Sequence, residues 1–276
     1  MGKARWASAG ALLACVVLAG CGATPAEPPP APPASQPADT PPREERLAAT
    51  LARAERALAE PGTSDVHRTH WAHRQQRVYR DLAEHPGWRD DVRARVPKRL
   101  RAAYDLTLHA AVELHHMSAA PSKIPDDWRI EAPPPVGELR RYYGAAQAKF
   151  GVPWQVLAAI NFVETRFGRI HGDSSAGAQG PMQFMPATWR IYGRGDIDAP
   201  RDAIQAAARY LAASGAPGDL RGALYAYNHS DHYVEAILAY AEAMRRYPHY
   251  LDVYHRWQVY YSTPHGDVVL KEGYGS

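Results

Sequence analysis

The chain is predicted to be an all-α protein with a small C-terminal β-hairpin. From residue 44 onward, Ala, Leu, Arg and Glu recur at the three- and four-residue spacing of helices. No convincing alternation of polar and apolar residues occurs before the last twenty positions. There, residues 258–261 and 268–270 flank a turn-rich segment and are expected to form the hairpin.

The first helices are expected in residues 44–120, which we interpret as a helical N-terminal region. Helices are predicted over residues 44–60, 65–84 and 88–118, because Pro-Gly pairs close the first two and apolar residues recur at helical steps in the third. Proline then becomes frequent in residues 121–135, which are interpreted as a linker.

A second helical region is predicted over residues 136–257, followed by a C-terminal tail over residues 258–276. It should begin with a helix over residues 136–150, and Pro153 should start the next helix from a first-turn position. That second helix is apolar nearly all round, so it is expected to be buried at the centre of the fold. Further helices are expected over residues 186–192, 200–214, 220–227 and 233–247.

Glu164 is the candidate functional residue, because it lies within the apolar central helix. Its neighbours three and four positions away on a helix would be Ile160, Asn161, Phe167 and Gly168. Apolar surroundings raise a carboxyl pKa, and an acid that is still protonated near neutral pH can donate a proton to a leaving group. A buried ion pair with Arg166 or Arg169 is the alternative interpretation.

Three short motifs follow one another in a characteristic order. They are Glu164-Thr165, the run Ser-Ser-Ala-Gly-Ala-Gln-Gly-Pro-Met-Gln at residues 174–183, and Ala-Tyr-Asn at residues 226–228. In this order they resemble the soluble lytic transglycosylases, whose catalytic domain is similar to goose-type lysozyme. The resemblance covers roughly residues 136–247 and implies a lysozyme-like helical catalytic domain over residues 136–257.

Two positions depart from the pattern of this family. Thr165 replaces the usual Ser, and Pro181 replaces the usual Leu. The run Glu-Thr-Arg-x-Gly-Arg from Glu164 and the sequence Gln-Phe-Met-Pro from Gln183 are instead similar to the membrane-bound B-type transglycosylases. We therefore expect Glu164 to have the role of the catalytic acid of this family, but we do not infer the shape of the sugar subsites from the resemblance.

The resemblance implies an activity and a set of site residues. The enzyme would cleave the MurNAc-GlcNAc bond of peptidoglycan without water and leave 1,6-anhydro-MurNAc ends, with Glu164 acting first as acid and then as base. The residues that would bind the substrate are Ser174, Met182, Gln183, Tyr227 and Asn228. Each also has an ordinary structural interpretation, since Met182 can be a core residue, Gln183 can cap a helix and Tyr227 can end one.

Two other functions remain open from the residues alone. A glycosidase that uses water needs two carboxylates, about 5 Å apart or about 6.5–9.5 Å apart. Asp173 is the nearest second acid, whereas Asp196 and Asp198 fit a turn and a helix cap. The alternatives are a muramidase-type hydrolase on the same fold and a non-catalytic, peptidoglycan-binding lipoprotein.

The N-terminus resembles a bacterial lipoprotein signal over residues 1–20. Basic residues precede a short apolar stretch, which ends in Leu-Ala-Gly before Cys21. Lipidation of Cys21 would anchor an exported protein to the outer face of the cell membrane, with the Pro-rich residues 21–43 as a tether. A chance cysteine or an ordinary secretory signal is the alternative.

Charge and histidine spacing restrict the other ligands. Residues 1–20 contain two of the 32 basic side chains, so the rest of the chain has 30 basic and 29 acidic side chains. This part is nearly neutral, and no nucleic-acid partner is expected. We expect no cofactor and a monomer that binds peptidoglycan strands. No metal is expected either, because none of the histidine groups shows a metal-binding spacing. These histidines are His67, His70, His73, His115, His116, His229 and His232.

Overall fold

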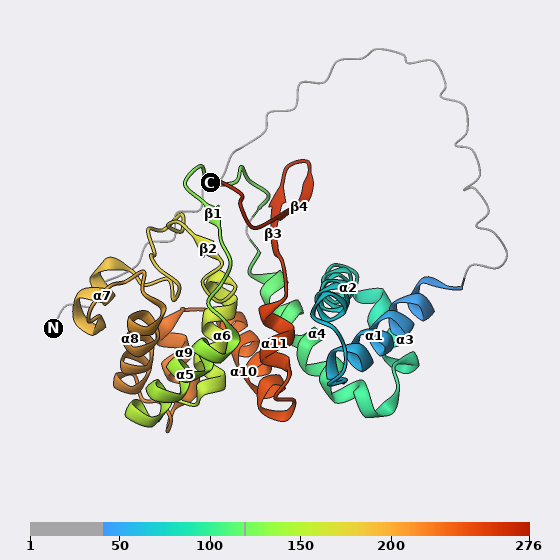
Figure 1. The fold of residues 1–276 in the computed structure, drawn as a ribbon, viewed down its shortest axis with the longest axis horizontal. Helices are drawn as coiled ribbons and strands as arrows, with labels where there is room; N and C mark the ends of the chain where they lie inside the picture. Colours follow the sequence, from blue (N-terminus) through green and yellow to red (C-terminus); the bar gives the residue numbers. More distant parts are fainter. Residues whose placement is uncertain (1–40, 119) are drawn as a thin grey trace, which may run out of the picture. The chain divides into compact units, whose positions relative to one another are not determined.

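The computed structural model describes residues 41–118 and 120–276, which are called the described unit below (Figure 1). The predicted signal, Cys21 and all but the last few residues of the predicted tether lie outside the described residues. Within the described part, eleven α-helices and two small antiparallel strand pairs confirm the all-α prediction. No described helix combines the length and the apolar character needed to cross a membrane.

The first part of the unit contains four α-helices. They are α1 (Arg43–Ala59), α2 (Asp65–Glu84), α3 (Arg89–Arg95) and α4 (Arg101–His116). The prediction of one helix over residues 88–118 is wrong, because the chain breaks at Val96, which is extended with ψ 131°. Pro97 follows and disfavours the helical conformation in the residue before it. Short 3₁₀ turns at Pro86–Trp88 and Lys98–Leu100 precede α3 and α4.

Seven helices follow in the second part. They are α5 (Val136–Phe150), α6 (Trp154–Thr165), α7 (Pro186–Tyr192), α8 (Pro200–Ala213), α9 (Leu220–Tyr227), α10 (Asp231–Arg246) and α11 (Tyr250–His255). The sequence did not predict α11. Helix α10 begins two residues earlier than predicted, because the Ser230 hydroxyl caps it by accepting a hydrogen bond from the Tyr233 amide at 3.4 Å.

The central position predicted for α6 is confirmed. Residues 156–162 of this helix are all buried, and α10 packs against it as well as against α4. The ring of Phe162 stacks on that of Tyr254 at 5.1 Å and meets that of Tyr240 edge-on at 4.9 Å. Buried residues of α1 to α4 belong to the same hydrophobic core, so the first four helices support the helices that surround α6.

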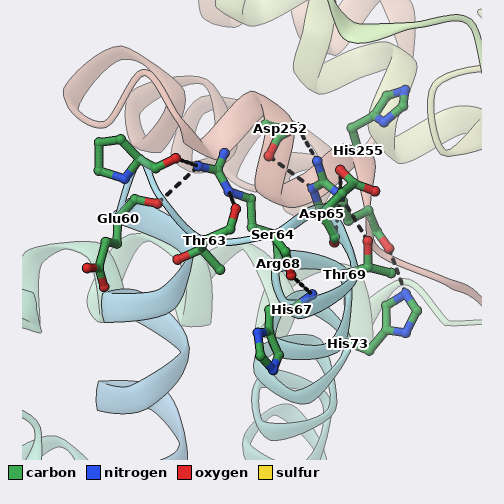
Figure 2. A network of polar contacts seen from close by, with 12 residues as sticks. Glu60, Thr63, Ser64, Asp65, His67, Arg68, Thr69, His73, Asp252 and His255 are labelled. Atoms are coloured by element: carbon green, nitrogen blue, oxygen red, sulfur yellow. Dashed lines mark hydrogen bonds and ion pairs between the residues drawn. The ribbon is translucent and has the colours of Figure 1, made fainter.

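A polar network also joins α2 to the end of α11 (Figure 2). The guanidinium of Arg256 donates two hydrogen bonds to Asp252, both at 3.0 Å, and one to the Thr69 hydroxyl at 2.9 Å. It also pairs with Asp65 at 2.8 Å. Because Arg256 is largely buried and its partners come from both helices, the network fixes α11 against α2.

Two strand pairs lie at the same end of the molecule (Figure 1). Strand β1 (Arg129–Ile130) pairs with β2 (Ile170–His171), so the predicted linker contributes a strand. Strands β3 (Val259–Thr263) and β4 (Gly266–Leu270) form the predicted C-terminal hairpin. Ile130, Val259 and Leu270 share a small apolar cluster, which holds the hairpin against the first pair.

Candidate active site

Helix α6 stops directly after Glu164 and Thr165. Arg166 and Phe167 both adopt left-handed backbone conformations, with φ of 53° and 65°. Such conformations cost roughly 1–2 kcal/mol for each non-glycine residue. Burial of Phe167 and a hydrogen bond of its amide to the Asn161 carbonyl at 3.0 Å oppose this cost.

This ending corrects one part of the sequence interpretation. Phe167 and Gly168 were expected to share a helix face with Glu164, but both lie beyond the helix. Glu164 is instead the penultimate helical residue, and its side chain is only partly buried. It therefore keeps access to solvent from the end of the central helix.

The Glu164 carboxyl accepts a hydrogen bond from the Tyr233 hydroxyl at 2.6 Å. Its densely packed surroundings raise the pKa of Glu164 to about 7, while the hydrogen bond from Tyr233 opposes the rise. Among the described residues, Glu164 forms no ion pair with Arg166 or Arg169, which was the alternative interpretation. The guanidinium of Arg166 lies over the Phe162 ring at 4.4 Å, and Arg169 pairs with Glu272.

Tyr233 is the site residue that the sequence analysis missed. It lies in the first turn of α10, is almost fully buried, and stacks parallel to Tyr227 with ring centroids 6.4 Å apart. The sequence offers one signal for Tyr233, which is its position at the start of a predicted helix shortly after the Ala-Tyr-Asn motif. That signal does not reveal the contact with Glu164, which lies 69 residues earlier in the chain.

A buried polar network fixes α6 to the segment that follows it. The Tyr143 hydroxyl donates to Asn161 Oδ1 at 2.6 Å, and Asn161 Nδ2 donates to the Pro181 carbonyl at 2.8 Å. The Thr165 hydroxyl donates to the same carbonyl at 2.7 Å. The two positions that depart from the family pattern, Thr165 and Pro181, are therefore in direct contact.

The segment from Gln179 to Phe184 forms a tight turn beside α6. The two end residues exchange backbone hydrogen bonds of 2.9 and 2.8 Å. Gly180 has φ 70°, and a Cβ atom there would lie 2.2 Å from the Ile197 carbonyl oxygen, so the turn requires glycine. Gln183 also has a positive φ of 49°, and its side chain donates to the Gly180 carbonyl at 3.0 Å.

Met182 and Tyr227 meet within the site. The Met182 side chain is fully buried, and its carbonyl accepts a hydrogen bond from the Tyr227 hydroxyl at 2.7 Å. Tyr227 is the last residue of α9, so this bond joins the turn to α9. The structure thus brings Glu164, Met182 and Tyr227 together through Tyr233 and the 179–184 turn.

Ser174 and Asn228 have structural contacts of their own. The Ser174 hydroxyl accepts from the Ala176 and Ala178 amides at 3.3 and 2.9 Å, which organises the loop before the turn. The backbone N–H of Asn228 caps α9, and its backbone carbonyl accepts a hydrogen bond from the Ser230 amide at 2.7 Å. The sugar contacts inferred for both residues stay predictions.

Asp173, the candidate second carboxylate, lies exposed on the same loop. Its carboxylate accepts a hydrogen bond from Gln179 Nε2 at 3.0 Å. Burial raises the pKa of Glu164, the Tyr233 hydrogen bond lowers it, and no charge of a described side chain contributes. A second carboxylate close to Glu164 would raise this pKa further by like-charge repulsion.

Comparisons with known proteins identify a related domain. Residues 141–248 match the family described as "Transglycosylase SLT domain". A 75-residue segment is 35% identical to a "Membrane-bound lytic murein transglycosylase F" from Thiobacillus denitrificans (strain ATCC 25259 / T1). This match covers 27% of the chain and 16% of the relative. No solved structure matches the chain. The chain therefore contains an SLT-type transglycosylase domain with an all-α, lysozyme-like fold.

Proposed function

We propose that the protein is a lytic transglycosylase that cleaves the MurNAc-GlcNAc bond of peptidoglycan and leaves 1,6-anhydro-MurNAc ends. The observation that carries this proposal is the Glu164 carboxyl, whose pKa is raised to about 7 and which accepts a hydrogen bond from Tyr233. The match of residues 141–248 to the SLT transglycosylase domain supports the substrate class.

In the first step Glu164 acts as the general acid. With a pKa of about 7, a substantial fraction of the carboxyl is protonated at neutral pH. It donates this proton to the glycosidic oxygen as the bond from that oxygen to C1 of MurNAc breaks. The N-acetyl group of the same sugar helps to stabilise the oxocarbenium-like state at C1.

In the second step the resulting Glu164 carboxylate acts as the base. It accepts the proton of the C6 hydroxyl as O6 forms a bond to C1, which closes the 1,6-anhydro ring and returns Glu164 to its protonated form. The Tyr233 hydroxyl donates to the carboxylate and so stabilises the charge that exists between the two steps. One carboxylate suffices, because the nucleophile belongs to the sugar.

The surrounding residues are proposed to form the sugar subsites. Tyr227 and Met182 hold the 179–184 turn next to the acid, and Gln183 stiffens that turn. Ser174 shapes the preceding loop, and Asn228 ends α9 beside Tyr227. In this proposal the turn and the loop form the wall that faces the N-acetyl groups.

Product analysis on purified sacculi tests the reaction type. A transglycosylase releases muropeptides that lack one water and carry anhydro ends, whereas a muramidase releases reducing ends. We expect anhydro ends from the parent. We expect them also from the Asp173→Asn variant, because the Asp173 carboxylate of the parent contacts Gln179 and has no role in the proposed reaction. Reducing ends from the parent, together with an inactive Asp173→Asn variant, would identify a hydrolase.

We further propose that the protein is exported and anchored to the outer face of the cell membrane by lipidation of Cys21. The sequence Leu-Ala-Gly-Cys that ends at this residue supports the proposal. The similar transglycosylase from Thiobacillus denitrificans is named as membrane-bound. An anchor of this kind would place the domain at the peptidoglycan.

A further inference from the structure

We propose that Glu113, His116 and His232 form a binding site for a divalent transition-metal ion, with zinc as the best match. Each residue offers one ligand atom, and these atoms all lie within 4.8 Å of one another. The site would join α4 to the first turn of α10. It lies outside the carboxyl site of Glu164 and has no step in the proposed reaction.

The helix geometry explains why the three side chains meet. Glu113 and His116 are three residues apart on α4, so both lie on one face of that helix. Helix α10 packs along α4 and places its second residue, His232, against that face. His232 Nδ1 lies 2.6 Å from Glu113 Oε2, and the rings of His116 and His232 are 5.0 Å apart.

Small side-chain rotations would convert this cluster into a coordination site. The ligand atoms of a tetrahedral zinc ion are about 3.3 Å apart, given bonds of about 2.0–2.1 Å. The largest separation between the ligand atoms, up to 4.8 Å, is longer than this, and the 2.6 Å contact between His232 and Glu113 is shorter. An ion would replace that hydrogen bond and draw the His116 ring toward the other two ligands.

The ligand types determine the class of ion. Two imidazoles and one carboxylate suit zinc, nickel or copper, whereas calcium and magnesium prefer sites made of oxygen ligands. Three protein ligands leave a fourth position for water. The His232 side chain is 51% exposed, so an ion can reach the site from solvent.

A third histidine lies near the carboxylate. His109 Nδ1 lies 3.7 Å from Glu113 Oε1, and His109 Nε2 lies 3.7 Å from Glu235 Oε2. The Glu113 side chain is only 15% exposed. The 2.6 Å contact with His232 already directs the Glu113 carboxylate toward that histidine before an ion binds.

The position of the site gives it a structural consequence. His232 directly precedes Tyr233, the residue that hydrogen-bonds Glu164. A bound ion would therefore fix to α4 the same first turn of α10 that contacts Glu164 at the end of α6. The stability of this turn should increase with the concentration of the ion, since the ion binds the folded state.

Calorimetric titration of the purified, metal-free full chain with ZnCl₂ tests the proposal. We expect one ion per chain, and we expect binding at least roughly tenfold weaker in the His116→Ala and His232→Ala variants. His115→Ala and His229→Ala are the matched controls. Both control residues are exposed histidines next to the site but outside the cluster, and their variants should bind zinc like the parent.

Thermal unfolding in the same buffers provides an independent measurement of zinc binding. Zinc should raise the Tm of the parent and of both controls but not that of the His116→Ala or His232→Ala variant. Thermal unfolding without metal shows whether each variant folds. If one histidine variant does not fold, Glu113→Gln replaces it as a more conservative substitution in the same cluster. An absence of stoichiometric binding in the parent, or equal weakening in the control variants, would overturn the proposal.

Discussion

The Tyr233 hydroxyl donates a 2.6 Å hydrogen bond to the Glu164 carboxyl and joins the first turn of α10 to the end of α6. The bond is stronger when the acceptor is charged, so it favours the carboxylate. Burial acts in the opposite direction, and the balance leaves the pKa of Glu164 at about 7. The acid is therefore set where it can both donate and accept a proton near neutral pH.

Replacing Tyr233 by Phe should reduce the turnover of sacculi by roughly 10–100-fold, because a hydrogen bond to a charged group contributes about 1.5–3 kcal/mol. Loss of the bond should also raise the pKa of Glu164, since the bond now lowers it. The alkaline limb of the pH-rate profile should therefore move to higher pH. Tyr227→Phe is the control, because the Tyr227 hydroxyl binds the Met182 carbonyl. If both variants keep the parent profile, Tyr233 does not set the pKa.

Glu164 should also make the folded state less stable as pH rises. Its pKa is about 7 in the folded protein, against an ordinary value of 4.5. Between these values the folded protein holds a proton that the unfolded chain has released, so the free energy of unfolding falls as pH rises through this window. Above about pH 7 the penalty is complete.

The Glu164→Gln variant removes this penalty while it preserves side-chain volume. It should be more stable than the parent at pH 8 by roughly 1–3 kcal/mol and nearly equal to it at pH 4. Denaturant unfolding at the two pH values measures the difference. A stability difference that does not change with pH would show that the Glu164 carboxyl is not perturbed.

The contact between Thr165 and Pro181 should contribute to the rigidity of the site. Thr165→Val keeps the shape but removes the hydroxyl that donates to the Pro181 carbonyl and accepts from the Gly168 amide. Because these groups are buried, we expect a loss of about 1–3 kcal/mol in the free energy of unfolding. Thr165→Ser retains the hydroxyl and should lose much less. Equal losses in the two variants would mean that the hydrogen bonds do not contribute.

Changing Cys21 to Ser should release the protein from the membrane fraction, because the lipidated residue would be absent. Fractionation of cells that express the parent or the variant, followed by immunoblotting, measures the distribution. Cys15→Ser is the matched control, since Cys15 lies within the predicted signal. A Cys21→Ser protein that remains with membranes as firmly as the parent would show that another feature anchors it.

The sequence was sufficient for α5 and α6, whose end and position follow from local signals. Helix α5 ends as predicted because Gly151, with φ 76°, can adopt the left-handed conformation that closes it. The central position of α6 followed from its apolar composition. The break at Val96 was missed because the apolar spacing continues through Pro97 and suggests a single helix.

Contacts between distant residues could not be predicted from local patterns. Tyr233 reaches Glu164 across 69 residues, and His232 reaches Glu113 across 119. Both contacts depend on how α10 packs against α6 and α4. For the same reason, the expectation that the histidines hold no metal considered only their spacing along the chain.

The most direct test of the central claim compares Glu164→Gln with Asp173→Asn in one assay of sacculus cleavage, with glycan binding measured in parallel. We expect Glu164→Gln to abolish cleavage but keep glycan binding, because the amide preserves size and polarity but cannot transfer the proton. Asp173→Asn should keep nearly full cleavage and anhydro products. Full cleavage by the Glu164→Gln variant would contradict the assignment of Glu164 as the acid and base.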